Sequence, residues 1–385
     1  MNSLAQFFTP DGVTRHVVAG LSASAPQKLV DLGVGIGCLL AAAHNRWPHA
    51  HLVGVDIDPT RVYSTHCRLP TANCFHADAL CYDLLNLLGI EAGSIDLAVG
   101  NPPYGRFQAG IDHKWILDEA NLADAVPLQR ITREVVFLAQ NLRLLRAGGE
   151  LAVILPEGIG TSQVYADLRR ALMERHGLWR VLELPPRLFR GTEAKTLAIF
   201  LRKGEQSGTV RLERWNDGGQ IVVSPGDAVH RLDASFHLAS YGIGKIILAD
   251  LAPEIKRGAV TREAAAKLGA TMFHTTDFKH YADGRARFPS DIDLPSRWLA
   301  KAGDLLIPRV GSRCLAHVVM VEAGQAVFTD CVYRIRVATE CCEALFRYLR
   351  SPEGVAQRLI RAHGVCARVL SKEELLKLPL PFTSL

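Results

Sequence analysis

Four consecutive residues, Asn101-Pro102-Pro103-Tyr104, have the chemistry needed to hold a flat, conjugated amine. They follow an apolar run, residues 95–99, that predicts a buried strand. An exocyclic amine is a poor nucleophile because its lone pair is delocalised. The Asn101 side-chain oxygen and the Pro102 carbonyl would accept its hydrogens, and Tyr104 offers a ring face for stacking. The prolines would stiffen this acceptor pair. A plain turn with an aromatic cap is the alternative interpretation.

Upstream, the order of residues predicts a strand, a glycine loop and a helix. The apolar run 28–32 leads into Gly33-Val34-Gly35-Ile36-Gly37, and a helix-like stretch follows at 38–47. Glycine lets a backbone approach a ligand closely, and the start of a helix presents amide donors. The spacing is G-x-G-x-G and not the G-x-G-x-x-G of dinucleotide-binding proteins. On its own, such a loop is equally compatible with a bare turn.

Three acids precede the tetrapeptide, each at the end of a predicted strand. Asp31 closes the first apolar run, Asp56 closes the second, and Asp78 follows the third. Asp56 is placed to accept both ribose hydroxyls of a nucleotide, and Asp78 stands where an adenine amino group needs an acceptor. Each acid alone could be a solvated loop residue or a helix cap. All four features in this order predict a nucleotide site beside an amine site.

This constellation resembles the S-adenosylmethionine-dependent methyltransferases, and specifically the gamma class of DNA adenine enzymes. In that class a cofactor segment, the glycine motif and the catalytic tetrapeptide come before a C-terminal target recognition domain. Gln6-Phe7-Phe8-Thr9-Pro10 resembles the N-terminal cofactor segment. The resemblance covers about residues 5–203. Asp31 departs from the pattern, because the nearest members often carry Glu there, with equivalent chemistry.

The resemblance implies a cofactor site and a base site. The implied cofactor-binding residues are Thr9, Pro10, Asp31, Gly33, Gly35, Asp56, Ile57, Asp78 and Ala79. Thr9 and Pro10 would contact the methionine end, and Ile57 would pack on the adenine ring. Phe189 would stack on a flipped adenine opposite Tyr104, with Asn101, Pro102 and Pro103 completing the catalytic set. A core phenylalanine at a hairpin bend is the alternative interpretation of Phe189.

The rest of the first half predicts one doubly wound, Rossmann-like α/β sheet. Helical periodicity at residues 132–146 and 166–176 alternates with apolar strands at 151–155, 181–184 and 195–201. Ligands of such sheets bind beyond the carboxyl ends of the strands, where the acids and the tetrapeptide fall. Residues 105–130 lack a clear period and predict an irregular segment, in which Arg106 is a candidate DNA contact.

The second half predicts an α+β domain. We expect a catalytic domain over residues 1–205, a Gly-, Ser- and Asp-rich linker over 206–227, and a second domain over 228–385. This last part resembles the target recognition domains of type I restriction specificity subunits. The likeness rests on the Arg231-Leu232-Asp233 opening, the strand within 303–311 and a closing capping box at 371–374. Candidate DNA contacts are Lys279, Arg285, Arg287, Arg309 and Arg313. Each of these could equally be a solvated side chain.

Composition limits the remaining choices. At 385 residues two domains are expected, and the net charge of +5 lies in residues 206–385, which suits a polyanionic partner. The nine cysteines include no C-x-x-C, which argues against a disulfide framework and a zinc site and favours a reducing cytoplasm. We expect no bound metal. No signal segment or membrane span is expected either, because no apolar run approaches the ~20 residues that a bilayer needs.

These expectations converge on a site-specific DNA adenine methyltransferase that uses S-adenosylmethionine. It would act as a monomer on duplex DNA, and a separate restriction endonuclease is a candidate partner. A protein glutamine methyltransferase shares the tetrapeptide, and a ribosomal RNA or cytosine amine methyltransferase shares the chemistry. A catalytically silent DNA-binding subunit is an alternative of another class.

Overall fold

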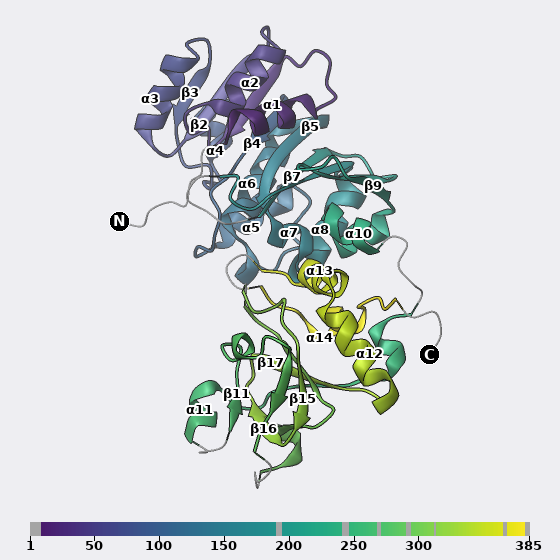
Figure 1. Cartoon of the computed structure of the whole chain (residues 1–385). Helices are drawn as coiled ribbons and strands as arrows, with labels where there is room; N and C mark the ends of the chain where they lie inside the picture. Colours follow the sequence, from purple (N-terminus) through teal and green to yellow (C-terminus); the bar gives the residue numbers. More distant parts are fainter. Residues whose placement is uncertain are drawn as a thin grey trace. The chain divides into compact units, whose positions relative to one another are not determined.

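The protein divides into two compact units, Met1–Leu238 and Ala239–Leu385, each described by itself (Figure 1). The structure is a computed structural model. It describes residues 9–189, 195–240, 246–267, 271–289, 294–311, 313–364 and 368–381.

The first unit is built on a sheet with the strand order β3-β2-β1-β4-β5-β7-β6-β8-β9. Strands β1 to β5 are mutually parallel, β7 runs antiparallel to its neighbours β5 and β6, β8 is parallel to β6, and β9 is antiparallel to β8. The strands are β1 Lys28–Leu32, β2 His51–Asp56, β3 Asn73–His76, β4 Ile95–Gly100, β5 Leu145–Pro156, β6 Arg180–Leu184, β7 Thr196–Arg202, β8 Val210–Arg214 and β9 Gln220–Val223. The predicted Rossmann-like α/β sheet is therefore confirmed.

Helices cover both faces of this sheet (Figure 1). They are α1 Asp11–Ala19, α2 Cys38–Arg46, α3 Pro59–Arg68, α4 Leu84–Leu88, α5 Ile111–Glu119, α6 Arg133–Leu144, α7 Glu157–Thr161, α8 Ala166–Arg175, α9 Pro225–His230 and α10 Ala234–Ser240. Short 3-10 turns lie at Leu128–Arg130 and Gln163–Tyr165. Residues 105–130 were expected to be irregular, but they contain α5. Packing stabilises this helix, since its Ile116 and Leu117 are fully buried.

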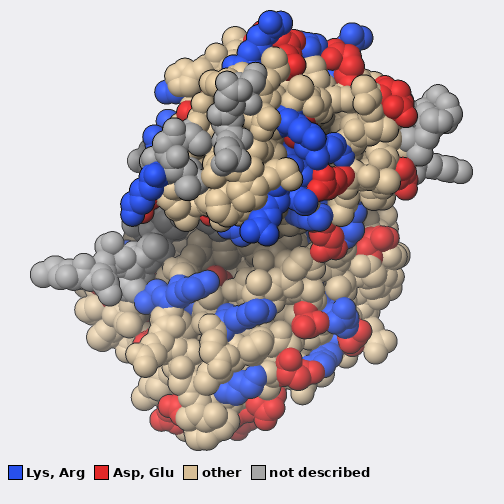
Figure 2. All heavy atoms as spheres, turned by 90° about the horizontal axis from the view of Figure 1, so that it is seen from below, with Lys and Arg blue, Asp and Glu red and all other residues tan. Residues whose placement is uncertain are grey.

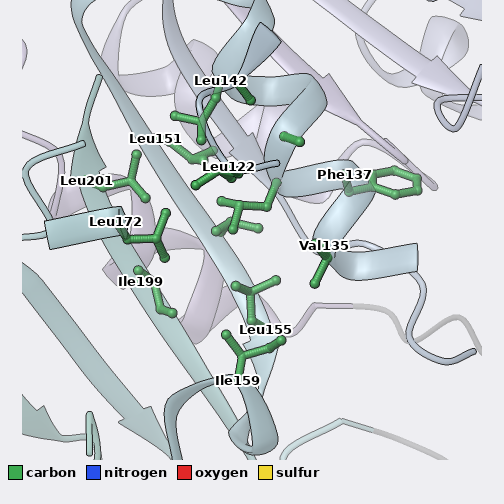
Figure 3. Packing of buried hydrophobic residues seen from close by; sticks show 14 of the residues in the cluster. Leu122, Val135, Phe137, Leu142, Leu151, Leu155, Ile159, Leu172, Ile199 and Leu201 are labelled. Atoms are coloured by element: carbon green, nitrogen blue, oxygen red, sulfur yellow. The ribbon is translucent and has the colours of Figure 1, made fainter. Parts of the chain in front are cut away.

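Alternation along the central strands creates two cores. Leu151 and Val153 of β5 pack into one apolar cluster, whereas Ala152 and Ile154 face the other. Successive side chains of a strand point to opposite faces, so a strand covered on both sides must be apolar throughout. Figure 3 shows the first cluster, in which side chains from α6, β5, α8 and β7 interdigitate. Both faces of the sheet are therefore covered, which leaves the ends of the strands as the place for a ligand site.

The segment predicted to be a linker belongs instead to the first unit. Residues 206–227 contain β8 and β9, and β8 pairs in register with β6 from Arg180↔Arg211 to Glu183↔Arg214. Val210 and Leu212 are fully buried. The flanking Gly, Ser and Asp residues form the turns around two short edge strands, which is why composition alone suggested a linker. The Arg231-Leu232-Asp233 segment, expected to open the second domain, also lies in the first unit.

The second unit combines two small sheets with helices, as the predicted α+β class requires. One sheet has the order β10-β17-β14-β15-β12 and the other β11-β16-β13. Their strands are β10 Glu254–Arg257, β11 Met272–Phe273, β12 Arg285–Arg287, β13 Leu299–Lys301, β14 Leu305–Pro308, β15 Val319–Ala323, β16 Gln325–Phe328 and β17 Val332–Arg336. The helices are α11 Arg262–Lys267, α12 Thr339–Arg350, α13 Pro352–Arg361 and α14 Lys372–Leu376, with 3-10 turns at Leu248–Leu251, Phe278–His280 and Ser296–Trp298.

Serine side chains cap two helices of this unit, and the second of these is the serine half of the predicted capping box at 371–374. Ser351 accepts a hydrogen bond from the Gly354 amide at the start of α13, and Ser371 accepts one from the Glu374 amide at the start of α14. None of the helices in the described part of the chain has the length and apolar character that crossing a membrane requires.

Candidate active site

The parallel strands carry the predicted polar residues to one edge of the sheet. Asp31 lies near the end of β1, where it pairs in register with Gly54 of β2 and Val99 of β4. Asp56 is the last residue of β2, Asp78 comes two residues after β3, and Asn101 directly follows β4. Because neighbouring parallel strands end together, side chains far apart in the sequence meet in one place.

Two adjoining pockets lie at this edge and share Gly33 and Pro103. The first, here the Asn101 pocket, is lined by Thr9, Asp31, Gly35, Arg61 and Asn101 besides the shared residues. The second, the Asp78 pocket, is lined by Asp56, Ile57, Asp78, Ala79, Arg133 and Phe137. All predicted cofactor residues except Pro10 line one of the two. Pro10 directly precedes α1 as its N-cap.

The glycine loop is shaped for close contact with a ligand. Gly33 has a φ of 76°, a left-handed conformation that glycine adopts without strain. A Cβ added there would lie 3.3 Å from the Phe137 ring. Gly37, with a φ of 77°, ends the loop against Thr65, where an added Cβ would come within 2.9 Å of the threonine methyl group. The loop therefore needs glycine at both positions for conformation and for space.

Asp56 holds the loop in place. Its Oδ2 accepts a hydrogen bond from the Gly35 amide at 2.8 Å, and its Oδ1 accepts one from the Asp58 amide at 2.9 Å. A carboxylate has about four lone-pair positions, so these two bonds leave acceptor capacity for ribose hydroxyls. The side chain is 3% exposed, which makes it a rigid acceptor.

Asp31 is a buried acid without a partner for one oxygen. Its side chain is 2% exposed, and the described residues offer Oδ1 no hydrogen-bond donor. Burial, reinforced by the negative charge of Asp56, raises the pKa of Asp31 well above its usual range. An unpaired buried acceptor is costly, and the carboxylate lines the Asn101 pocket. The ammonium group of a methionine moiety would supply the missing donor and favour the charged form.

The Asp78 pocket fits an adenine ring. Ile57 keeps an apolar side chain 44% exposed at the pocket, and Phe137 lies on its lining beside Pro103. Asp78 is exposed, and its Oδ1 accepts the Leu80 amide at 2.9 Å, which orients the carboxylate. These features, together with Asp31 and the glycine loop, make the residues present a good fit to S-adenosylmethionine.

At the tetrapeptide, hydrogen bonds fix the side chain of Asn101. Its Nδ2 donates to Thr9 Oγ1 at 3.1 Å, and its Oδ1 accepts from the Tyr104 hydroxyl at 3.0 Å. That hydroxyl also lies 3.3 Å from the Ile154 carbonyl oxygen. Burial, with the charge of Glu134, raises the pKa of Tyr104, so the hydroxyl is a donor at all ordinary pH values. The amide oxygen is thereby oriented before any substrate arrives.

Phe137, Arg133 and Arg61 are among the pocket-lining residues that sequence reasoning missed. Phe137 belongs to the apolar face of α6, where its helical spacing gave no sign that its ring also borders Gly33. Arg133 begins the same helix and donates to the Arg106 carbonyl oxygen at 3.3 Å. Arg61 lies on α3 and forms an ion pair with Asp58 at 3.4 Å. No local motif marks either arginine; the pairing of distant elements brings them here.

The position of Phe189 agrees with the alternative interpretation, that of a phenylalanine buried in the core. It is 2% exposed and packs in the apolar cluster that contains Leu184 and Phe200. In this conformation its ring presents no face to a base, so the predicted stacking role is not the one that the structure displays. The following residues 190–194 lie outside the described part of the chain.

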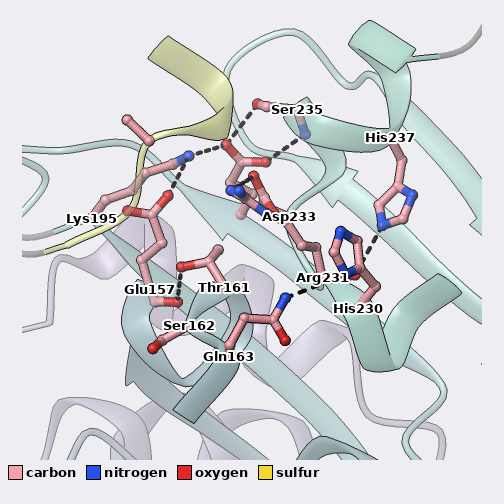
Figure 4. Close-up of polar contacts among 12 residues, drawn as sticks. Glu157, Thr161, Ser162, Gln163, Lys195, His230, Arg231, Asp233, Ser235 and His237 are labelled. Atoms are coloured by element: carbon pink, nitrogen blue, oxygen red, sulfur yellow. Dashed lines mark hydrogen bonds and ion pairs between the residues drawn. The ribbon is translucent and has the colours of Figure 1, made fainter. Parts of the chain in front are cut away.

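A buried ionic network joins the ends of β5, β6 and β7 (Figure 4). Lys195 lies 3.0 Å from Glu157 and 2.5 Å from Glu183, and Glu183 also accepts hydrogen bonds from the amide and hydroxyl of Ser235. Nearby, Arg231 and Asp233 form a bidentate pair with 2% and 1% side-chain exposure. Burial opposes charge on Lys195, but Glu157 and Glu183 outweigh it and raise the pKa of Lys195. The Arg-Leu-Asp motif is thus a buried part of the first unit, and its Leu232 amide donates to the Gly160 carbonyl oxygen of α7.

The predicted DNA contacts in the second unit differ in their surroundings. Arg285 pairs with Glu322 and Glu343, Arg287 pairs with Glu322, and Arg309 donates to the Asp330 carbonyl oxygen. Lys279 and Arg313 are exposed, and no ion pair of either occurs among the described residues. Figure 2 shows that Lys and Arg alternate with Asp and Glu over much of the face it presents. In the first unit, the Arg106 side chain is exposed, and its backbone forms an isolated antiparallel β-bridge with Thr132.

The strand order and the pocket pair define the first unit as an S-adenosylmethionine-dependent methyltransferase domain. Comparison with known proteins gives the family. The model of the N-6 DNA Methylase family matches residues 2–217, more than half of the chain, and the chain belongs to this family.

Similar proteins include enzymes acting on DNA and on RNA. Type II methyltransferase M.XamI of Xanthomonas campestris pv. amaranthicola is 27% identical over 213 residues, covering 53% of this chain and 40% of that protein. The tRNA1(Val) (adenine(37)-N6)-methyltransferase of Porphyromonas gingivalis W83 is 27% identical over 195 residues, covering 46% and 68%. The chain spans about half the length of the curated DNA methylases it matches.

One solved structure is similar in fold over both units. The type IIG restriction endonuclease BpuSI has a TM-score of 0.54 at 13% identity, covering 98% of this chain and 59% of that one. At this identity the likeness concerns the fold alone.

Proposed function

We propose that the chain is a site-specific DNA adenine methyltransferase of the gamma class. It would transfer a methyl group from S-adenosylmethionine to N6 of an adenine flipped out of duplex DNA. The observation that carries this proposal is the position of Asn101, which lines the same pocket as Asp31 and the glycine loop. An acceptor for an amine therefore adjoins the end of the cofactor site that would hold the methyl donor.

The chain would activate the amine by hydrogen bonding. Asn101 Oδ1 and the Pro102 carbonyl would accept the two N6 hydrogens and concentrate the lone pair on nitrogen. Because an amide oxygen has two lone pairs, Asn101 can accept from the Tyr104 hydroxyl and from the amine together. Bound S-adenosylmethionine supplies an electrophilic methyl group. The N6–carbon bond forms as the methyl–sulfur bond breaks, and the nitrogen then releases a proton to water.

Tyr104 would provide the stacking face for the extruded base. Stacking on an aromatic ring contributes about 1–3 kcal/mol per base, comparable to the few kcal/mol that base flipping costs. Phe189 would join it only after its ring leaves the apolar cluster that surrounds it here. A variant with Leu at position 189 separates these roles, because it retains apolar volume and removes the stacking ring.

The second unit would recognise the target sequence. Support comes from its α+β architecture, its serine-capped closing helices and the fold likeness to BpuSI, which extends over both units. With this unit following the tetrapeptide, the order of parts is that of the gamma class. We propose a monomer in the cytoplasm, and a separate endonuclease as a candidate partner where modification serves restriction.

RNA is the second candidate substrate, and one comparison favours it. The tRNA1(Val) methyltransferase relative aligns over 195 residues and carries an adenine-N6 activity in its name. The same amine chemistry would serve either polymer. The family, however, is described by DNA methylation, and its model covers residues 2–217.

The deciding experiment offers labelled S-adenosylmethionine with duplex DNA, and separately with transfer RNA, and identifies the methylated nucleoside. Label in N6-methyldeoxyadenosine, confined to one sequence context, is the expected result. Label in cytosine would retain the mechanism and change the base. Transfer to RNA alone, or to neither polymer, would refute the proposal.

A further inference from the structure

Two grooves of the second unit differ in charge balance. The first, here the Glu322 groove, contains the charged residues Arg287, Lys301, Asp304, Glu322, Arg336 and Glu343 in its lining. The second, the Lys279 pocket, is lined by Phe278, Lys279, Tyr281, His317 and Arg350 with small neighbours, and no carboxylate is in that lining. Each is formed within the second unit.

In the Glu322 groove both arginines of the lining are already paired, whereas Lys301 is exposed and forms no ion pair among the described residues. Arg336 lies 2.7 Å from Asp304, whose side chain is fully buried, and Arg287 lies 3.0 Å from Glu322. Arg285 adds bonds to Glu322 at 3.0 Å and to Glu343 at 2.9 Å. Three cations against three carboxylates in the lining leave no net positive charge. A phosphate would have to displace a carboxylate to bind either arginine.

In the Lys279 pocket neither cation forms an ion pair with an acid of the described residues. Lys279 is exposed and, within the described residues, forms no ion pair. Arg350 ends α12, donates to the Ala282 carbonyl oxygen at 3.0 Å and has its guanidinium carbon 5.5 Å from the centre of the Phe346 ring. Neither of these contacts neutralises its charge.

Arg350 is exposed, and the Ala282 carbonyl oxygen and the Phe346 ring orient its guanidinium. A Cβ on Gly284 would fall 1.6 Å from Arg350 Nη1, the flexible end of that side chain, and 2.9 Å from the Val318 carbonyl oxygen. Gly284 also has a φ of 76°. A planar guanidinium held in advance loses little side-chain entropy when it binds a phosphate. The acids nearest along the chain are Asp277, Asp283 and Glu353, and none of them is part of the lining. Asp277 accepts a hydrogen bond from the His274 amide, and Asp283 accepts one from the Arg285 amide.

We propose that the Lys279 pocket binds the phosphate backbone of DNA through Lys279 and Arg350, and that the Glu322 groove does not. The proposal rests on the proposed function, and it names which basic residues of the second unit meet the polyanion. The proposal keeps Lys279 from the contacts predicted from the sequence and adds Arg350. It no longer counts Arg285 and Arg287 as DNA contacts. Tyr281, half-buried in the lining, gives the sugar or a base an aromatic surface.

The test measures how the affinity of the full chain for labelled duplex DNA depends on salt, by fluorescence anisotropy. Each phosphate contact contributes about 0.9 to the slope of log affinity against log salt. We expect Lys279→Ala to lower the slope by about 0.9, and Lys279→Ala with Arg350→Gln to lower it by about 1.8. If affinities converge at 1 M salt, the double variant binds about 60-fold more weakly at 0.1 M.

The matched control is Arg285→Ala with Arg287→Ala, which removes two positive charges that are already paired with Glu322 and Glu343. Its slope should equal that of the wild type. Thermal unfolding of the full chain, followed by circular dichroism, checks that the second unit of every variant is folded, and S-adenosylmethionine affinity checks the first unit. If loss of Arg350 unfolds the second unit, Lys279→Ala alone decides, since this exposed side chain forms no ion pair within the described residues.

The outcomes separate the inference from the function on which it rests. A wild-type slope in Lys279→Ala, or an equal loss in the control, overturns the inference while methylation of DNA by the wild type stands. If Arg350 only stabilises α12, the double variant will show the same slope loss of about 0.9 as Lys279→Ala alone. That result would overturn the assignment of Arg350 as a phosphate contact. A wild type that neither binds nor methylates duplex DNA, or prefers an RNA duplex, overturns the function itself.

Discussion

Replacing Asn101 by Ala should abolish most turnover and leave both binding steps nearly intact. The substitution removes one of the two proposed acceptors for the N6 hydrogens and retains the Pro102 carbonyl. Removing one preorganised group that stabilises developing charge costs about 100- to 1000-fold in rate. This corresponds to about 2.7–4 kcal/mol in the activation barrier. We expect a loss in that range for methyl transfer in a single turnover.

The structure also limits the effect of this change on folding. Asn101 makes hydrogen bonds to Thr9 and Tyr104, each contributing about 1 kcal/mol net. The Tyr104 hydroxyl retains the Ile154 carbonyl as a partner at 3.3 Å. A destabilisation of about 1–2 kcal/mol follows, too small to account for the loss of rate.

The assay is rapid-quench transfer of labelled methyl groups to duplex DNA at saturating protein, paired with calorimetric titration of S-adenosylmethionine. Tyr104→Phe is the matched control, because it removes the same hydrogen bond to Asn101 and preserves the aromatic ring. That control should lose less than about 10-fold, since an oriented acceptor remains. Turnover of Asn101→Ala within about 10-fold of the wild type would refute the assignment of Asn101 as the amine acceptor.

Three further substitutions test the site and its support. Gly33→Ala should cost about 1–2 kcal/mol from its left-handed φ and weaken S-adenosylmethionine binding measured by titration, because the new methyl group approaches Phe137 at 3.3 Å. Asp31→Asn should raise the melting temperature of the cofactor-free chain at pH 8 and weaken cofactor binding. The raised pKa of Asp31, caused by burial and Asp56, means that the folded chain holds this proton to higher pH than the unfolded chain. Its stabilising contribution is therefore present at low pH and lost as pH rises through the folded pKa, and melting curves of the variant against pH should lack this loss. Arg231→Ala should destabilise the first unit by about 3–5 kcal/mol, as breaking a buried ion pair does, and unchanged denaturant unfolding would contradict this expectation.

Much of the cofactor site could be predicted from the sequence because its logic is local. A glycine loop after an apolar strand, with acids at successive strand ends, needs only the parallel sheet to bring the parts together. Asp31, Asp56 and Asp78 follow this rule, and the structure brings all three to pockets at one edge. Arg61 and Phe137 could not be found in this way, because each reaches the pocket from the side of a helix whose own pattern reports only packing.

The boundary between the units shows a different limit. Residues 206–227 look like a linker in composition, yet β8 adds to the sheet by pairing with β6. Strand pairing at an edge needs few apolar side chains, since the backbone supplies the hydrogen bonds. In this segment Val210, Leu212 and Val223 are the buried apolar side chains of the core cluster. A prediction that relies on hydrophobic runs therefore misses short edge strands between glycine-rich turns.

Charge is the property that the sequence predicts least well. Arg285 and Lys279 are both basic residues of the same unit, and no feature of their neighbours in sequence separates them. The separation arises from tertiary pairing, because Glu322 and Glu343 come from β15 and α12 to meet Arg285, whereas no carboxylate reaches the lining around Lys279. An arginine with two acidic partners must break charge-assisted bonds before it can bind a phosphate. Net charge in the second half thus indicates a polyanionic partner, but only the pairing of each cation indicates where that partner would bind.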